Sequence, residues 1–162
     1  MPANNVTPID PARQRSEDLR RKVFAGTLGK LTAADWDTLM ARAETRQYRY
    51  DDVILAQGFV GAALYVIADG EVRIERANAG RSAQLARLGP GSVFGEMSLL
   101  DEAGASASVI ADGKVEVICL DGADLGALVR ADSGFAARFY QSLATTLSRR
   151  LRATNELILG RF

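Results

Sequence analysis

The sequence predicts a mainly β domain with helices at both ends, and three observations lead to this fold class. Between residues 45 and 120, apolar and polar side chains alternate with a period of two, which is typical of half-buried strands. Turn signals divide this region into seven or eight short segments, as in a β-sandwich or barrel. Before and after it, the apolar period lengthens to three or four residues, which indicates helices. A chain of 162 residues that is 48% hydrophobic is sufficient for one such core.

The N-terminal residues are expected to lie outside the core. Residues 1–18 carry three prolines among polar side chains and are predicted to form a mobile arm. A short helix is predicted over Leu19–Phe24. A second helix is expected to begin after Thr32, which forms a capping-box pattern with Asp35, and to end near Glu44.

Eight segments have the alternation and the flanking turns of strands. In the fourth of them, Val72 and Ile74 are expected to face inward and the charged residues between them to face solvent. Asp69-Gly70, after the third segment, is a strong turn signal. The predicted strands are Gln47–Tyr50, Val53–Ala56, Leu64–Ala68, Val72–Arg76, Ser82–Leu88, Val93–Phe94, Val109–Ala111 and Val115–Leu120.

Two helices are predicted to complete the chain. Asp121 is expected to cap a helix that runs to Arg130, and Asp132 or Ser133 to cap a longer one that ends near Leu159. The longer helix carries one apolar stripe of more than about six turns. Its members are Phe135, Phe139, Leu143, Leu147, Leu151, Thr154 and Ile158.

A stripe of this length is expected to need a partner. We predict a homodimer through Phe135–Ile158, because a second copy of the same helix is the simplest partner. The alternative is that the helix lies on its own barrel. The arginines of this helix are expected to form its solvated face.

Composition excludes several classes of function. The 20 basic and 20 acidic residues cancel, so no overall charge favours nucleic acid or an anionic membrane. The chain has no histidine and one cysteine, Cys119, which lies in an apolar segment and is expected in the core. These counts oppose a haem, zinc or redox site. No apolar run is long enough to span a membrane and no signal peptide is evident, so a cytoplasmic location is expected.

The segment Phe94–Ala111, FGEMSLLDEAGASASVIA, has the layout of a backbone pocket for a phosphate and a sugar. Gly95 lets the backbone approach closely, and the carboxylate of Glu96 follows at once. A short apolar turn comes next, whose first amide groups can bind an anion. A run of small residues, Ala103–Ser108, then leads into a strand.

Three motifs resemble the cyclic-nucleotide-binding domain of the catabolite-activator type. They are LYVIADGEV at 64–72, LGPGSVFGE at 88–96 and RRLRATNE at 149–156. The resemblance covers Leu19–Glu156 and implies an eight-stranded double-stranded β-helix (jelly-roll) barrel. It implies a barrel domain over residues 19–132, a dimerisation helix over 133–162, and a non-catalytic regulatory module whose ligand is cyclic AMP or cyclic GMP.

The resemblance also assigns roles to residues of this chain. Glu96 is implied to accept a hydrogen bond from the ribose 2′-hydroxyl, and Ser106 to contact the phosphate. Thr154 of one chain and Asn155 of the other are implied to meet the purine. The remaining residues of the implied ligand site are Phe94, Gly95, Met97, Ser98, Ala105 and Ala107.

Each of these polar residues also has a purely structural interpretation. Glu96 is a carboxylate close to a helix N-terminus, where it is favourable without any ligand. Ser106 suits the turn before a strand. Thr154 can donate to the backbone of its own helix.

The chain departs from the family where the phosphate is expected. Family members carry Pro-Arg-x-Ala, and this chain carries Gly104-Ala105-Ser106-Ala107, so the arginine that pairs with the phosphate is replaced by Ala105. Arg73, Arg81 and Arg87 on nearby strands are candidates to replace it, or are surface residues. A helix-turn-helix segment, which catabolite activators use to read DNA, is not recognised before Phe162, so no DNA-binding domain is expected.

Two functions therefore stay open. The first is a dimeric nucleotide sensor that signals through its last helix to a protein partner that the sequence does not identify. The second is a degenerate domain that has lost its ligand and acts as a dimerisation or protein-interaction scaffold. An enzyme is opposed, because no pair of nucleophile and base is visible and Glu96 lacks an acid–base partner.

Overall fold

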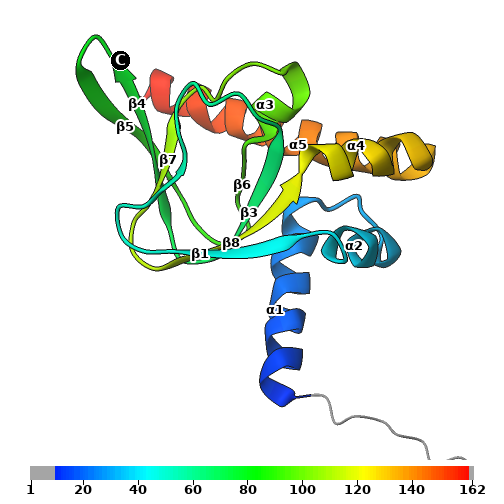
Figure 1. Cartoon of the computed structure of the whole chain (residues 1–162). Coiled ribbons are helices and arrows are strands. Elements are labelled where there is room, and N and C mark those ends of the chain that lie inside the picture. Colours follow the sequence, from blue (N-terminus) through cyan, green and yellow to red (C-terminus); the bar gives the residue numbers. More distant parts are fainter. Residues whose placement is uncertain (1–9, 161–162) are drawn as a thin grey trace, which may run out of the picture.

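The computed structural model describes residues 10–160 and confirms a mainly β fold with eight strands. The strands form two four-stranded antiparallel sheets that face each other, as in a jelly roll (Figure 1). Sheet A has the order β1-β8-β3-β6 and sheet B the order β2-β7-β4-β5. The strands are β1 Glu44–Tyr48, β2 Val53–Leu55, β3 Ala63–Asp69, β4 Val72–Asn78, β5 Arg81–Leu88, β6 Val93–Phe94, β7 Ser108–Ala111 and β8 Val115–Asp121.

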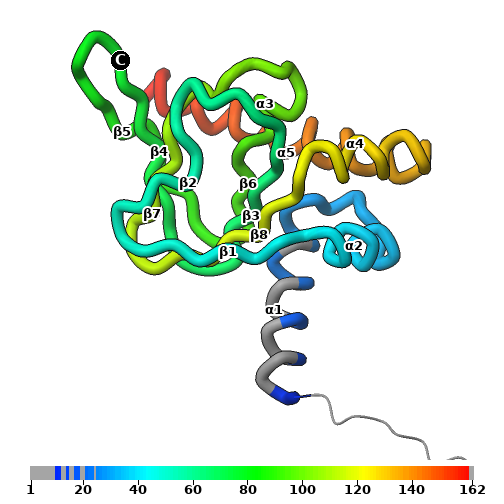
Figure 2. The backbone as a smooth tube through the Cα atoms, viewed as in Figure 1, coloured from blue at the N-terminus to red at the C-terminus, as the bar shows by residue number. Residues whose placement is uncertain are grey.

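Successive strands mostly alternate between the two sheets. The Asp69-Gly70 turn, which the sequence marks as a strong turn signal, leads from β3 in sheet A to β4 in sheet B, so these two strands do not pair as a hairpin. Figure 2 traces these crossings along the backbone. Strands β4 and β5 are the pair joined by a tight turn, at Ala79-Gly80, and they extend from the barrel as a long hairpin.

Sheet A separates two cores, because its central strands are buried on both faces. In β3, Leu64 and Val66 pack against the helices, whereas Tyr65 and Ile67 face the barrel interior. This alternation follows directly from the strand period of two. Cys119 lies in the interior core, as expected, and burial raises the pKa of its thiol.

Residues 10–160 form five helices beside the barrel (Figure 1). They are α1 Pro11–Thr27, α2 Ala33–Met40, α3 Glu96–Asp101, α4 Gly122–Ala131 and α5 Ser133–Leu159. The caps of α2, α4 and α5 follow the sequence signals. Thr32 and Asp35 form the predicted capping box, and Asp121 accepts from the amide of Ala123. Asp132, rather than Ser133, caps α5 by accepting from two backbone amides.

Three predicted boundaries near the N-terminus were wrong. The predicted helix over Leu19–Phe24 lies in the C-terminal half of a longer helix, and the part of the predicted arm from Pro11 onward is helical too. Proline is well tolerated in the first turn of a helix, so the prolines of this segment did not by themselves indicate an irregular arm. Helix α2 ends at Met40 and β1 already begins at Glu44. Residues 1–9 of the predicted arm lie outside the described residues.

The stripe on α5 divides into a buried and an exposed part. Phe135, Phe139 and Leu143 are nearly fully buried against sheet A and the other helices. Beyond them, Leu151 is 63% exposed and Ile158 is 53% exposed. The helix therefore both lies on its own barrel and presents an uncovered apolar face.

Two arginines that were expected on solvated faces are instead held by carboxylates. Arg138 of α5 binds both carboxylate oxygens of the buried Asp35 at 2.7 and 2.8 Å, which ties α5 to α2. Arg73 of β4 is only 14% exposed and pairs with Asp51 and Glu75. The predicted outward orientation of Arg73 is correct, but its solvation is not.

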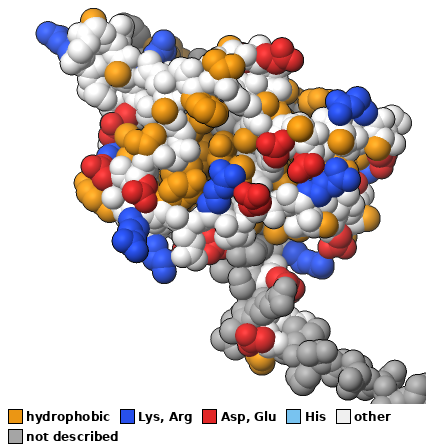
Figure 3. Space-filling model, in the orientation of Figure 1, with side chains coloured by type: hydrophobic (Ala, Val, Ile, Leu, Met, Phe, Trp, Pro, Cys, Tyr) orange, Lys and Arg blue, Asp and Glu red, His pale blue; other side chains and the backbone are white. Residues whose placement is uncertain are grey.

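The face of the molecule in Figure 3 carries no single dominant charge. Acidic and basic side chains are interspersed with apolar ones on the face shown in Figure 3, in keeping with a formal net charge of zero. Within residues 10–160, none of the helices combines the length and apolar character that crossing a membrane requires. That part of the chain also holds no cluster of acidic, cysteine or histidine side chains suited to a metal ion.

Candidate functional site

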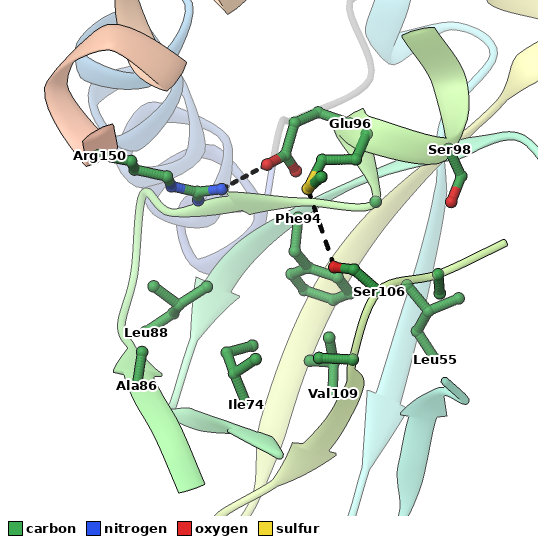
Figure 4. Close-up of a pocket in the computed structure, with 14 residues that line it drawn as sticks. Leu55, Ile74, Ala86, Leu88, Phe94, Glu96, Ser98, Ser106, Val109 and Arg150 are labelled. Carbon is green, nitrogen blue, oxygen red and sulfur yellow. Dashed lines mark hydrogen bonds and ion pairs between the residues drawn. The ribbon is translucent and has the colours of Figure 1, made fainter. Parts of the chain in front are cut away.

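A cavity of about 210 Å³ lies between the segment Phe94–Ala111, here called the cassette, the inner face of sheet B and helix α5 (Figure 4). The cassette contributes Phe94 through Ser98 and Ala105 through Ala107, sheet B contributes apolar side chains, and α5 contributes Arg150. Segments that are more than fifty residues apart in the sequence therefore meet at one cavity.

The structure brings together eight of the ten predicted site residues. These eight line the cavity and are Phe94, Gly95, Glu96, Met97, Ser98, Ala105, Ser106 and Ala107. Thr154 and Asn155 do not line it and are exposed on α5. The hydroxyl of Thr154 donates to the carbonyl of Arg150, which is the structural role considered for it.

Gly95 allows the backbone to turn from β6 into α3 while it passes close to β3. Its φ is +81°, a left-handed conformation that favours glycine, and it precedes α3 without any side-chain cap. A Cβ at this position would lie 2.6 Å from the carbonyl oxygen of Ala63 on β3. The close approach to β3 fixes the position of the next residue, Glu96.

Glu96 is the buried charged group of the cavity, and Arg150 is its partner. Its carboxylate is 5% exposed and receives a hydrogen bond from Arg150 Nη1 at 2.6 Å (Figure 4). The second amino group of Arg150 donates to the carbonyl of Val93. A buried carboxylate needs such a partner, because an unpaired buried charge is strongly unfavourable.

Arg150 was missed by the sequence analysis, which placed the arginines of this helix in solvent. It is the only cationic side chain among the described residues that line the cavity. A signal was present, since Arg150 lies three residues after Leu147 and four before Thr154 and so shares a face with the stripe.

The wall opposite Glu96 is apolar. Side chains from all four strands of sheet B form it, and Phe94 closes the base, where its ring stacks on Tyr65 with centroids 4.8 Å apart. This wall was not among the site residues predicted from the sequence, although the strand alternation indicated inward-facing side chains. The strand residues of the wall are Leu55, Ile74, Ala86, Leu88 and Val109.

The corner where the family carries its arginine is small and apolar. Ala105 is 7% exposed, and its backbone pairs with the loop after β2: its amide donates to Phe59, and its carbonyl accepts from Gly58. A Cβ on Gly104 would lie 2.9 Å from the carbonyl oxygen of Gly58, which leaves no room for a side chain there. None of Arg73, Arg81 and Arg87 lines the cavity.

Two serines add hydroxyl groups to the cavity. Ser106 is exposed, and its Oγ lies 3.8 Å from the sulfur of Met97, a weak contact that a better acceptor can replace. Ser98 is buried on α3 and also lines the cavity. The cavity thus combines an apolar wall, two hydroxyls and one carboxylate–guanidinium pair.

Residues 45–132 match the family model described as the cyclic nucleotide-binding domain. The chain belongs to this family. The cassette and the strands on either side of it fall within the match, whereas Arg150 lies beyond it.

Relatives of the cyclic nucleotide-binding family support the assignment. The cyclic AMP receptor protein of Thermus thermophilus is 41% identical over 123 residues, which are 75% of this chain and 55% of that protein. The cAMP-dependent protein kinase regulatory subunit of Mycosarcoma maydis is 27% identical over 77% of this chain and 23% of that protein. The chain therefore spans about half of the first relative and a smaller share of the second.

Solved structures of the family show the same fold. The Thermus thermophilus catabolite activator protein aligns with a TM-score of 0.70 and 39% identity over 83% of this chain and 62% of that one. A cyclic nucleotide-binding domain from Methylobacillus flagellatus aligns with a TM-score of 0.78 over 87% of this chain and 85% of that one. The latter shares 22% identity and shows the fold alone.

Proposed function

We propose that this chain is a non-enzymatic regulatory module that binds a cyclic mononucleotide in the cavity beside Glu96. The observation that carries the proposal is the buried Glu96 carboxylate, which lines a cavity with an apolar wall. A carboxylate accepts hydrogen bonds from ribose hydroxyls, and an apolar wall suits the face of a purine. Membership of the cyclic nucleotide-binding family and the cAMP-related names of the relatives support the same ligand class.

The phosphate contact in this proposal differs from the family pattern. With Ala105 in place of the arginine, the side-chain donors that line the cavity are the hydroxyls of Ser98 and Ser106 and the Arg150 guanidinium. A hydrogen bond to a charged group contributes roughly 1.5–3 kcal/mol, so the missing arginine weakens binding by about tenfold to a hundredfold. The ligand is therefore expected to bind more weakly than in members that keep the arginine.

Ligand binding in this site acts on α5 through Arg150. A ribose hydroxyl that donates to Glu96 competes with the Arg150 pair, and a phosphate attracts the same guanidinium. Because Arg150 is a residue of α5, either contact changes how the helix is held against the cassette. A protein partner that recognises the exposed part of α5 would detect the change.

A second copy of the chain is part of the proposal. The exposed apolar residues Leu151, Leu157 and Ile158 offer a surface for a parallel partner helix. Thr154 and Asn155 are on the same exposed segment, so in a dimer they are the residues of α5 best placed to meet a base. In a dimer, Thr154 and Asn155 would therefore contact the ligand although they do not line the cavity of a single chain.

The second candidate function is a scaffold that has lost its ligand. Ala105 favours it, because the phosphate corner offers neither charge nor side-chain donor. The existing pair of Arg150 with Glu96 also satisfies both groups without a ligand. This candidate predicts a dimer that is indifferent to nucleotides.

Isothermal titration calorimetry separates the two candidates. We expect saturable heat with cyclic AMP or cyclic GMP, and about tenfold weaker binding in Glu96→Gln, which keeps the side-chain volume but removes the charge. Glu102→Gln is the matched control, because Glu102 is the exposed C-cap of α3 and does not line the cavity. Cyclic dinucleotides serve as a further ligand class.

Absence of heat with every nucleotide in the wild type would contradict the sensor. If Ala105→Arg then gains binding, the cavity has kept its shape and lost only its anion contact, as the scaffold candidate requires. Thermal melting gives an independent readout, because a ligand that binds only the native state raises the midpoint.

A further inference from the structure

A second cavity, of about 190 Å³, lies beside α5 and shares Arg150 with the first. It is formed where the end of α1, the turn between β5 and β6, and the middle of α5 meet. Its lining residues are Gly26, Thr27, Gly91, Ser92, Val93, Thr146, Arg149 and Arg150. Of these, Val93 and Arg150 connect it to Glu96 through the contacts described above.

The chemistry of this second cavity favours an anion. Two consecutive guanidinium groups, Arg149 and Arg150, line it, and no carboxylate does. Arg149 forms no ion pair with any residue that the structure describes. Guanidinium groups hold oxyanions through several parallel N–H donors, which a single ammonium group cannot match.

The other polar side chains that line the second cavity are Thr27, Thr146 and Ser92. The hydroxyl of Thr146 donates to the carbonyl of Thr27 and so ties α5 to α1. The hydroxyl of Thr27 lies within hydrogen-bond distance of two carbonyls, of Val23 in α1 and of Gly91 in the β5–β6 turn, so neither hydroxyl is needed for an anion. Ser92 adds a hydroxyl at the β5–β6 turn. A side chain on Gly26 would project into open space, since nothing lies within 4 Å of its ideal Cβ position.

We propose that this second cavity binds one oxyanion of phosphate size, either inorganic phosphate or the end of a phosphomonoester. Arg149 and Arg150 hold the anion, and Ser92 donates to it. Occupancy lowers the affinity of the first cavity for a cyclic nucleotide, because both anions attract the same Arg150 guanidinium and repel each other. The coupling rests on the proposed function, whereas the anion binding does not.

The coupling is reciprocal by thermodynamic necessity. If phosphate weakens cyclic-nucleotide binding by a given factor, the cyclic nucleotide weakens phosphate binding by the same factor. Arg150 is 33% exposed and Glu96 is 6% exposed at their side chains, so the shared pair is screened less than a surface pair. We expect a coupling factor on the order of fivefold, at the lower end of typical allosteric couplings.

The test is a titration of the ¹⁵N-labelled full chain with sodium phosphate at constant ionic strength, balanced with sodium chloride. We expect saturable shifts of the backbone amides of Gly26, Ser92 and Thr146, with a dissociation constant on the order of 1 mM. Arg149→Ala should weaken this binding by about tenfold, because it removes a charged hydrogen-bond donor. Arg152→Ala is the matched control, since Arg152 is an exposed arginine of α5 that lines neither cavity.

A second arm uses glycerol 3-phosphate in place of phosphate. Tighter binding of the monoester identifies a phosphorylated metabolite as the natural class, and equal or weaker binding identifies free phosphate. Shifts that do not saturate, or that change equally in Arg149→Ala and Arg152→Ala, overturn the proposal.

A third arm repeats the cyclic-nucleotide calorimetry with and without saturating phosphate. Weaker nucleotide binding in phosphate supports the coupling, and unchanged binding overturns it. If no nucleotide binds at all, the proposed function fails, but the phosphate titration still decides whether the second cavity is an anion site.

Discussion

Single residues set the geometry of the first cavity, the one beside Glu96, and Gly95 is the clearest case. It combines a left-handed backbone with a close approach to the carbonyl of Ala63, so two independent constraints require the absence of a side chain. Because Glu96 follows directly, the direction of the buried carboxylate depends on this glycine.

Gly95→Ala is expected to destabilise the protein by roughly 1–3 kcal/mol, since it adds backbone strain and a backbone clash. Urea denaturation measures the change. Gly89→Ala is the matched control in the preceding turn, because nothing lies within 4 Å of its ideal Cβ position, and its effect should stay within about 0.5 kcal/mol. Equal losses in the two variants would contradict the role given to Gly95.

Ala105→Arg is expected to raise the affinity for a cyclic nucleotide by about tenfold to a hundredfold, because it restores a guanidinium at the phosphate corner. Calorimetry of the variant against the wild type measures the gain. Ala105→Gln adds an uncharged polar side chain, shorter than that of arginine, and should gain little. If both variants gain equally, size rather than charge is responsible.

The sequence predicts site residues that lie in one stretch of chain better than site residues that come from separate elements. Phe94 through Ala107 was identified because a cassette is read along one stretch of chain. Arg150 was missed because a helix interior offers several faces, and only the packing of α5 on sheet A decides which of them meets the cavity. The apolar wall, from Leu55 to Val109, required knowing which strands neighbour each other.

Among the elements, α5 has two different halves. Its first half is part of the core through Phe135, Phe139 and Leu143. Its second half exposes apolar side chains that a globular surface rarely presents on one helix. The length of the stripe was predictable from its period, but the point where the barrel stops covering it was not.

Leu151→Glu is expected to shift the protein from dimer to monomer while leaving the barrel folded, since Leu151 is 63% exposed within one chain. Sedimentation velocity measures the change. Ala153→Glu is the matched control, because residue 153 is exposed and points about 200° around the helix from residue 151. A wild type that sediments as a monomer at all concentrations would contradict the dimer proposal.

Element boundaries were predicted within a few residues for the strands and less well for α1. Strand ends follow turn residues that are visible in the sequence, whereas α1 begins at Pro11, a residue that marks helix starts and irregular segments alike. Which strands pair with each other was harder to predict than where each strand ends. The Asp69-Gly70 turn joins strands of different sheets, and turn chemistry alone does not reveal this.

For the molecule as a whole, the Asp35–Arg138 pair joins segments that are 103 residues apart. Hydrogen bonds from Arg138 lower the pKa of Asp35 from 3.8 to about 2, despite the opposing effect of burial. The folded state therefore binds a proton at Asp35 less readily than the unfolded state. The pair stabilises the fold above about pH 4, and this contribution is lost as the pH falls toward about 2.

Asp35→Asn is accordingly expected to lower the free energy of unfolding at pH 7 by about 2 kcal/mol, and the difference from wild type should shrink between pH 4 and pH 2. Urea denaturation at several pH values measures both. Asp37→Asn is the matched control on α2, because its pair with Arg21 is exposed on both sides and should contribute less than about 0.5 kcal/mol. A difference that stays constant across this pH range would contradict the assignment.

The contacts that hold α5 to the rest of the protein end at the first cavity. Arg138, Ser142, Thr146 and Arg150 each bind another element, and every described residue after Arg150 is exposed. The segment from Arg150 to Leu159 is about 14 Å long at the rise of an α-helix. The last residue of α5 that is held by another element is thus Arg150, which faces Glu96. By simple geometry, any change in the angle of the helix at this contact would move Leu159 further than Arg150.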